Sequence, residues 1–452
     1  MTFSNPIIAA GVGGLADLFS DRAVTPVEVC EAYLSRIRGL DGAIGAYVAV
    51  DEDGARNAAH ASAERWAAGA PLSRIDGVPI AVKANIAVEG MSWDAGIEAY
   101  RGRLPEADAT VIDRLREAGA VILGLVNMHE GAFGGVTDNA WFGRTQNPHR
   151  HGYTSGGSSG GSGAAVAAGL CAAALGTDTL GSVRIPSSYC GTYGHKPTQG
   201  LISTEGVVVL SWTLDHVGVL ARSAEDCAKV LAAACGAEAE LASEIAEPAS
   251  ADDLHGVSIA ALAWDGQVEV EPAIAAAFQR TVIAAQAAGL EVEPLRLDID
   301  YQEIFLLAHL VSAAESLVEH ADHLASAPEK FSPMLQGRLD IGRSASAADL
   351  ARAYRRLSII ADQVREAITP YSALLLPTTP QTAFPFEIGE PMSIPFFTQL
   401  ADITGLPATA FPVGAADGLP LSVQAMAWDD ETSLGLARLL GHPFEAPEAL
   451  RG

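Results

Sequence analysis

The feature that most constrains this chain is a stretch of small residues between Ser155 and Thr198. It opens with the glycine–serine run SGGSSGGSG and passes through an uncharged, alanine-rich segment from Gly163 to Gly176. It closes on a second glycine-containing turn, Gly176 to Arg184, which carries Ser182. A segment without charge is typical of a protein interior, so two serine-bearing loops are expected at the ends of one buried element. Serine hydroxyls beside exposed backbone N–H groups indicate a nucleophile and an oxyanion hole.

Two other kinds of loop share this composition. A Gly/Ser-rich run is usually a flexible linker, but this one continues directly into a buried segment. A phosphate-binding loop needs a Gly-Lys-Ser/Thr ending, which the run lacks.

The two motifs together resemble the amidase signature family of serine hydrolases. That family carries Gly-Gly-Ser-Ser-Gly-Gly-Ser, here residues 156–162, and Gly-Thr-Asp-x-x-Gly-Ser-x-Arg-x-Pro, here residues 176–186. The resemblance implies that Ser182 is the nucleophile, that Ser158, in a cis peptide, is the proton relay, and that Lys83 is the base. Further matches run from Thr25 through Gly77–Lys83 and Lys196–Thr198 to Pro377–Pro380, so the resemblance covers nearly the whole chain.

The same resemblance assigns residues around the nucleophile. Its oxyanion hole would consist of the backbone N–H groups of Thr179, Leu180, Gly181 and Ser182. Ser159 is expected to orient the relay. Asp178 and Arg184 flank the nucleophile, and we interpret them as a structural pair that holds the turn.

Four positions depart from the family pattern. Leu180 stands where glycine is usual, so it would be strained if the turn needs positive φ, or it projects into the acyl pocket and narrows it. Ala84 replaces an Asp, His195 replaces an apolar residue, and Trp93-Asp94 replaces a small polar pair. Together these departures suggest an unusual substrate pocket.

The substrate is the least constrained part of the prediction. Met128, Trp93, Trp212 and Phe396 lie in segments expected to line the cleft, although each is equally consistent with the core. No arginine is obviously placed to bind a carboxylate. We therefore expect a hydrolase of non-peptide C–N bonds that cleaves a small neutral carboxamide, such as an aryl amide or anilide.

Three alternatives stay open. The substrate is a urea or biuret derivative, or the chain is the glutaminase (A) subunit of an aminoacyl-tRNA amidotransferase, which shares these motifs. A non-catalytic binding protein on an amidase scaffold is the alternative from another class, because fold alone does not settle function.

The composition of the chain excludes some classes of binding partner. The net charge of −27, with only 28 basic residues, argues against nucleic acid or an anionic membrane surface as a partner.

The five cysteines are odd in number and lack CxxC spacing, so we expect buried, reduced thiols. No secretory signal or membrane-length apolar run is recognised, which favours a cytoplasmic protein. A metal is not expected, because His149-x-His151 has no further ligands at suitable spacing, and no cofactor is expected. The expected partners are an amide substrate and water, with homodimerisation left open.

The periodicity of the chain predicts an α/β fold in one large domain, residues 1–452. A mixed central sheet would be covered by helices on both faces. The resemblance implies a signature core at about 70–220 and a helical insertion at about 300–368 that roofs the cleft. Thr25-Pro26-Val27-Glu28 is a helix-capping box. The long loop from Asn127 to Tyr153 is expected to be functional. The acidic, alanine-rich residues 236–254 are expected on the surface. The clearest expected strands are 75–83, 121–124, 172–177, 256–263, 290–297, 374–377, 408–413 and 421–426, and the clearest helices are 55–68, 108–117, 163–170, 272–288 and 430–440.

Overall fold

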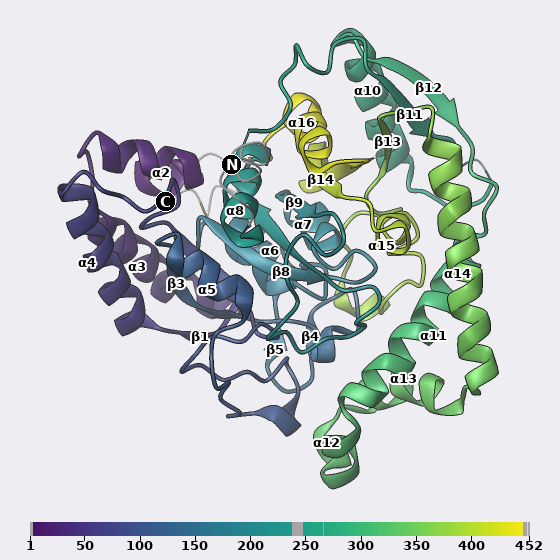
Figure 1. Ribbon diagram of the computed structural model, residues 1–452, viewed down its shortest axis with the longest axis horizontal. Coiled ribbons are helices and arrows are strands. Elements are labelled where there is room, and N and C mark those ends of the chain that lie inside the picture. The colour runs from purple at the N-terminus through teal and green to yellow at the C-terminus, as the bar shows by residue number, and fades with distance from the viewer. Residues whose placement is uncertain (1–2, 237–246, 265, 446–449, 451–452) are drawn as a thin grey trace.

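The computed structural model describes residues 3–236, 247–264, 266–445 and 450, and its centre is one mixed sheet (Figure 1). The expected surface segment 236–254 lies partly outside the described residues. In sheet order the eleven strands are β1 Tyr47–Val50, β3 Val121–Val126, β2 Pro79–Lys83, β8 Ala173–Asp178, β10 His216–Ala221, β9 Tyr193–Lys196, β14 Ala408–Ala416, β15 Leu419–Ala427, β13 Ala373–Pro377, β11 Ser258–Leu262 and β12 Glu291–Leu295.

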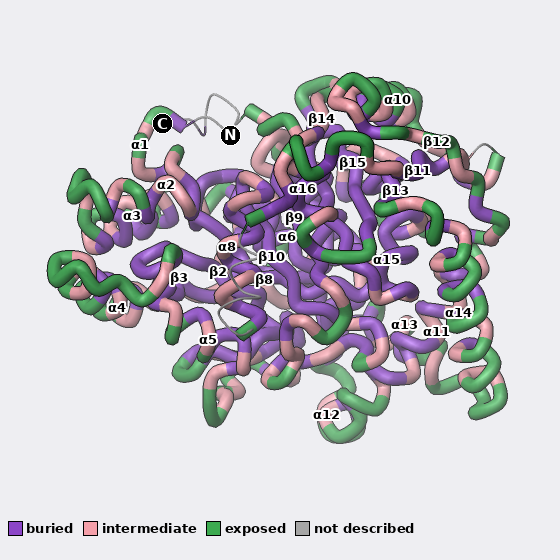
Figure 2. Tube along the Cα trace, turned by 45° about the horizontal axis from the view of Figure 1, so that its top comes forward, coloured by how far each residue is buried: buried purple, intermediate pink, exposed green. Residues whose placement is uncertain are grey.

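The parallel strand pairs form two groups in this sheet, one toward each end. β2 runs parallel to both β3 and β8, and β11 runs parallel to both β12 and β13. The strands between these two parallel groups pair in the antiparallel sense. Every residue of β2, β3, β8, β10, β13 and β15 is buried. Strands covered on both faces are expected to be mainly apolar, as these are, although polar residues such as Lys83, Asp178 and His216 stand at strand ends. The buried centre is visible along the chain trace (Figure 2).

Helices cover the faces of the sheet. Their bounds are α1 Pro6–Ala9, α2 Gly11–Ser20, α3 Pro26–Ile44, α4 Glu52–Ala67, α5 Thr110–Glu117, α6 Gly160–Ala167, α7 Arg184–Cys190, α8 Ala224–Cys235, α10 Pro272–Ala287, α15 Gln399–Thr404 and α16 Asp430–Leu440. Both α6 and α8 pack on β10, while α7 and α16 pack on β14 and β15. The expected α/β fold with a mixed sheet between helices is confirmed.

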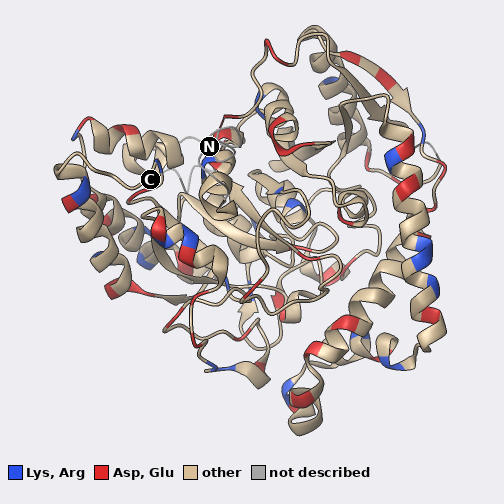
Figure 3. Ribbon diagram, in the orientation of Figure 1, with Lys and Arg blue, Asp and Glu red and all other residues tan. Residues whose placement is uncertain are grey.

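A group of helices late in the chain forms one side of the molecule (Figure 1). These are α11 Tyr301–Glu319, α12 Ala321–Ser326, α13 Pro333–Ser344 and α14 Ala347–Ile368. α11 packs against both α13 and α14, and α14 packs against α15. Figure 3 shows that α14 carries several of the chain's few basic residues, whereas acidic residues are spread over the surface.

Local signals predicted several boundaries correctly. The Thr25 hydroxyl accepts from the Glu28 N–H and the Glu28 carboxylate accepts from the Thr25 N–H, so α3 begins at the expected capping box. All five cysteines are buried free thiols, as expected. Within the described residues, no helix is long and apolar enough to cross a bilayer.

Other boundaries differ from the prediction. The N-terminus forms the helix α1 from Pro6, which was not among the expected helices, and the Asn5 side chain caps it. α6 starts at Gly160 instead of Gly163, since the glycines allow tight packing: a Cβ on Gly161 would lie 2.3 Å from the carbonyl oxygen of Asn127. Residues 127–153 are not a plain loop, because they pair as two small sheets. These are β4 Asp138–Asn139 with β5 Gly143–Arg144, and β6 Gln146–Asn147 with β7 Arg150–Thr154.

Candidate active site

Lys83 ends the buried strand β2, where its side chain is fully enclosed. Its Nζ donates to the Ser158 hydroxyl at 2.7 Å and to the Thr177 hydroxyl at 2.7 Å. Thr177 lies on β8, which runs parallel to β2, so the carboxyl ends of the two strands bring these groups to one edge. Burial lowers the pKa of Lys83 to about 7, although Asp215 and Asp178 act in the opposite direction. About half of the Lys83 amines are therefore neutral near pH 7.

Ser158 sits above Lys83 at the start of the first motif and is also fully buried. The peptide bond between Gly157 and Ser158 is cis. Gly157 must be glycine, because a Cβ there would lie 2.5 Å from the Val136 nitrogen. The Ser158 carbonyl accepts from the His129 N–H at 3.0 Å. These contacts fix the Ser158 hydroxyl against the Lys83 amine.

Ser159 has a different set of partners from Ser158. Its hydroxyl donates to the Thr177 carbonyl at 3.2 Å and accepts from the Thr177 N–H at 3.3 Å. Its own N–H donates to the Ser182 carbonyl at 3.2 Å. Ser159 thus joins the two motif loops through the backbone.

Ser182 lies in the turn between β8 and α7 and is 9% exposed. The turn depends on Gly181, which has a φ of 126° and whose Cβ would lie 2.2 Å from the Thr398 hydroxyl. Leu180 is not among the described non-glycine residues with positive φ, so the expected strain there is absent. The Leu180 carbonyl instead accepts from the Thr398 hydroxyl at 2.6 Å. In the described part of the chain, no hydrogen bond joins the hydroxyls of Ser182 and Ser158, and such contacts often tighten only around substrate.

The Asp178–Arg184 pair holds this turn from behind. Arg184 is completely buried, and its guanidinium contacts the Asp178 carboxylate at 3.0 Å and the Asp402 carboxylate at 2.7 Å. It also donates to the Thr398 carbonyl at 2.7 Å. Burial alone would raise the pKa of Asp178, but the Arg184 charge and hydrogen bonds hold it below its usual range. Both groups are charged and face each other rather than the cavity.

The expected oxyanion hole has one donor that is already engaged. The Gly181 N–H donates to the Asp178 carboxylate at 2.5 Å, which fixes the turn. The backbone N–H groups of Leu180 and Ser182 have no loop or turn partner among the described residues. The Thr179 hydroxyl donates to Asp215 at 2.5 Å, and burial raises the pKa of Asp215 to about 6.

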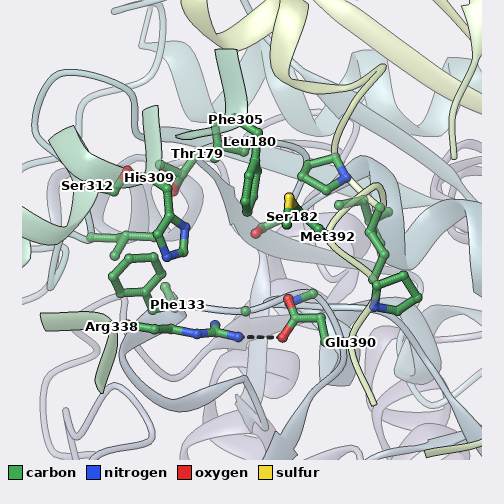
Figure 4. Close-up of a pocket in the computed structure, with 18 residues that line it drawn as sticks. Phe133, Thr179, Leu180, Ser182, Phe305, His309, Ser312, Arg338, Glu390 and Met392 are labelled. Atoms are coloured by element: carbon green, nitrogen blue, oxygen red, sulfur yellow. Dashed lines mark hydrogen bonds and ion pairs between the residues drawn. The ribbon is translucent and has the colours of Figure 1, made fainter. Parts of the chain in front are cut away.

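A cavity of about 290 Å³ opens onto Ser182 (Figure 4). Most of its wall is apolar and includes Phe133, Leu180, Phe305 and Met392. Leu180 therefore projects into the pocket, which was the second of the two expectations for that residue. Phe133 and Phe305 flank the His309 ring at 4.7 and 5.2 Å between centroids. Burial lowers the pKa of His309 to about 4, so this ring is neutral.

The four residues expected to bind substrate do not line this cavity. Met128 is fully buried in the main core, and Trp212 is 55% exposed. The Trp93 indole donates to the Asn85 carbonyl and stacks on Arg103, while Phe396 packs on Phe305 behind the wall. Aromatic character alone did not identify the lining residues, since it is shared with the core.

The charged residues of the cavity were not predicted from the sequence. Arg338 of α13 and Glu390, which follows the short helix η4 Phe386–Ile388, both line it and form an ion pair at 2.6 Å. Two further residues were not predicted: Thr177, which contacts the Lys83 amine, and Asp215, which accepts from the Thr179 hydroxyl. Thr177 and Thr179 lie inside the second motif and offered a signal. Arg338 and Glu390 are far apart in the sequence, and no local pattern joins them.

The histidines singled out in the sequence have structural surroundings. The His195 ring contacts the Thr409 hydroxyl and the Asp430 carboxylate, each at 2.9 Å, and so joins three elements. His149 contacts the Cys190 carbonyl at 2.7 Å, and His151 is exposed. No group of three or more metal-ligating side chains is found within the described residues.

Comparison with known proteins agrees with this geometry. A family model described as Amidase matches residues 28–434. The A subunit of the glutamyl-tRNA(Gln) amidotransferase of Desulforudis audaxviator is 32% identical over 446 residues, which cover 91% of this chain and 90% of that protein. The chain therefore belongs to the amidase signature family, whose members are hydrolases of C–N bonds.

Solved structures show the same fold. One of them belongs to a vestigial protein complex described as revealing the evolutionary origins of an s-triazine catabolic enzyme. It is 32% identical with a TM-score of 0.86, and the match covers 94% of this chain and 97% of that one. A peptide amidase, PAM, in complex with the competitive inhibitor chymostatin is 25% identical with a TM-score of 0.83, covering 96% and 99%.

Proposed function

We propose that this protein is a serine amidase that hydrolyses the C–N bond of a small-molecule carboxamide through Ser182, Ser158 and Lys83. The observation that carries the proposal is the enclosed Lys83 amine, 2.7 Å from the Ser158 hydroxyl. The next residue, Ser159, is hydrogen-bonded to Ser182, which lines the cavity. A lysine with a pKa of about 7 is an effective general base near neutral pH.

Each proton has a defined destination in the proposed reaction. The Ser182 hydroxyl oxygen attacks the amide carbonyl and forms the C–O bond of a tetrahedral intermediate. Its proton moves to Ser158, whose own proton moves to the neutral Lys83 amine. Collapse of the intermediate breaks the C–N bond, and the relay returns the proton to the leaving nitrogen. Water then repeats the sequence in place of Ser182 and releases the carboxylic acid.

Developing charge on the carbonyl oxygen needs donors that are already in place. The N–H groups of Leu180 and Ser182 are the candidates that the turn leaves without a loop partner, with Thr179 beside them. Asp178 and Arg184 act as positioning residues, because they hold the turn without lining the cavity. Removing one hydrogen-bond donor of an oxyanion hole typically slows catalysis about 10²- to 10³-fold.

The size and lining of the cavity support a small substrate. A volume of about 290 Å³ corresponds to roughly ten water molecules. Its apolar wall, with the aromatic rings of Phe133 and Phe305, suits an uncharged acyl or aryl group. A urea or biuret derivative would also fit this volume.

The amidotransferase alternative rests on a specific comparison. Several relatives, at 31–34% identity, carry the name of the glutamyl-tRNA(Gln) amidotransferase A subunit. Such a protein would act on glutamine and work with partner subunits. Glutamine hydrolysis, together with co-purification of a second subunit, is the observation that would favour it.

The test is a substrate panel with a nucleophile variant. Primary amides, anilides, ureas and glutamine are incubated with the enzyme, and ammonia and amine release are followed. The proposal predicts turnover of small amides that Ser182→Ala abolishes, while a control variant at the partly exposed Ser203, Ser203→Ala, keeps it. Equal turnover by Ser182→Ala would contradict the proposal. Inertness of Ser182 toward a sulfonyl fluoride would favour the non-catalytic binding protein.

A further inference from the structure

The cavity contains one ion pair that the proposed reaction does not use. Arg338 reaches into it from α13, and Glu390 reaches in from the segment after η4. The Arg338 Nη2 donates to one Glu390 oxygen at 2.6 Å, and the Gly135 N–H donates to the other at 2.6 Å. Figure 4 shows the pair below Ser182 in that view, with Leu180 and Phe305 above. The pair therefore faces the space that a substrate bound at Ser182 occupies.

Two glycines make room for this pair. A Cβ on Gly134 would lie 2.6 Å from the Arg338 Nη1, and one on Gly135 would lie 3.3 Å from a Glu390 oxygen. The Phe133 ring lies 5.5 Å below the guanidinium, which favours a cation over its face. Because Gly134 and Gly135 lack side chains, Arg338 and Glu390 can lie close to the backbone of this cavity wall.

The pair carries no net charge. Burial would raise the pKa of Glu390, but the nearby Arg338 charge lowers it below its ordinary value, so the carboxylate is ionised. His129, which lies under Gly134, has its pKa lowered to about 4 by burial and is neutral. No further charge in the lining offsets either member of the pair. A substrate with one net charge at this point would leave a partner unpaired, which is unfavourable in a largely apolar cavity.

The pair still has hydrogen-bonding capacity. Arg338 has five N–H donors, and its only hydrogen bond within the described residues goes to Glu390. Each oxygen of a carboxylate accepts more than one hydrogen bond, so Glu390 can accept another. Its side chain is 25% exposed and that of Arg338 is 18% exposed, and both line the cavity. A donor therefore lies beside an acceptor on this wall.

A carboxamide or ureido group presents the complementary pattern, a carbonyl acceptor next to an N–H donor. We infer that the substrate carries a second, uncharged group of this kind, whose carbonyl accepts from Arg338 and whose N–H donates to Glu390. The scissile amide then lies at Ser182. The inference rests on the proposed function and specifies its substrate class as a diamide or ureido-amide. A monocarboxylate would have to displace Glu390 from Arg338.

The test compares shape-matched substrates. These are succinamide, 3-ureidopropanamide, succinamic acid and 4-methylpentanamide, with glutamine as the zwitterionic competitor. The wild-type kcat/KM for succinamide or 3-ureidopropanamide should exceed those for the other three at least tenfold. In Glu390→Gln the Arg338 charge is no longer neutralised, so the ratio of kcat/KM for succinamic acid to succinamide should rise at least tenfold.

A matched control removes the same charge nearby. Glu387 lies three residues earlier, within η4, is exposed and does not line the cavity. Glu387→Gln should leave the substrate ratio unchanged, and circular dichroism of both variants checks their folding. A similar rise in both variants would overturn the inference, because the effect would then be a general change in surface charge.

Further outcomes separate the inference from the proposed function. Turnover of simple amides with succinamic acid or glutamine preferred would overturn the inference and leave the amidase function standing. If no amide is hydrolysed, the proposed function fails. Calorimetric binding of succinamide and succinamic acid to Ser182→Ala then tests the pair alone, and equal or tighter binding of the acid would overturn the inference.

Discussion

The burial of Lys83 leads to a prediction of how activity and stability depend on pH. Complete burial lowers its pKa from the ordinary 10.5 to about 7. This corresponds to an advantage on the order of 5 kcal/mol for the neutral amine over the ammonium inside the fold. The neutral fraction is about 0.1 at pH 6 and about 0.9 at pH 8. Accordingly, kcat/KM should rise nearly tenfold over that interval and level off above it.

The same pKa fixes the sign of the stability effect. Between about pH 7 and pH 10.5 the unfolded chain binds more protons at Lys83 than the folded chain does. The free energy of unfolding therefore rises with pH through this window, by up to about 1.4 kcal/mol per pH unit from this group. Below pH 7 the unfavourable contribution of Lys83 is fully present and no longer changes with pH.

Lys83→Met isolates this contribution, because it keeps an unbranched side chain and removes the titrating amine. The unfolding free energies of wild type and variant are measured by urea denaturation at pH 7, 8 and 9. Their difference, wild type minus variant, should become more positive at each step. A difference that stays constant with pH would refute a neutral Lys83 amine, and an activity profile that is flat between pH 6 and pH 8 would refute a Lys83 pKa near 7.

Three further substitutions test neighbouring parts of the site. Ser158→Ala should lower kcat about 10²- to 10⁴-fold while the urea midpoint stays close to that of wild type, because a proton relay acts on the rate; a loss below tenfold in an ammonia-release assay would exclude a relay. Leu180→Gly should lower the free energy of unfolding by about 0.5–1 kcal/mol, because it relieves no strain. It should also raise kcat/KM for bulky acyl groups relative to small ones, because it widens the pocket. An unchanged preference across a series of amides would show that Leu180 does not limit the acyl group. Arg184→Met should lower the free energy of unfolding by about 3–5 kcal/mol, because Asp178 and Asp402 lose their buried partner; a loss under about 1 kcal/mol would show that the pair does not hold the turn.

Much of the fold was predictable because its signals are local. The capping box at Thr25 marks the start of α3, and apolar runs bounded by turns mark β2, β3 and β13. The strands β9 and β10 were not predicted individually, because glycine and histidine interrupt the apolar pattern of both segments, YGHK and HVGVLA. α6 was predicted three residues short, since glycine usually indicates a loop, and here it permits close helix packing.

The candidate site divides in a similar way. Ser158 and Ser182 lie in two neighbouring motifs and Lys83 ends an apolar run upstream, so the resemblance to the family was enough to predict all three. Arg338 and Glu390 meet only because α13 and the segment after η4 converge on the cavity, and nothing local in the sequence relates them. Met128 and Trp212 show the opposite error, because large apolar side chains are as frequent in cores and on surfaces as in pockets.

If Ser182 is the nucleophile, it forms a covalent acyl-enzyme, and this species can be trapped. A small carboxamide found to be turned over is mixed with enzyme, quenched within milliseconds to seconds, and the protein is mapped by peptide mass spectrometry. The peptide that contains Ser182 should gain a mass equal to that of the acyl group, and this gain should be absent from Ser182→Ala. Turnover with the acyl group on another residue, or with the same adduct in Ser182→Ala, would contradict this role of Ser182.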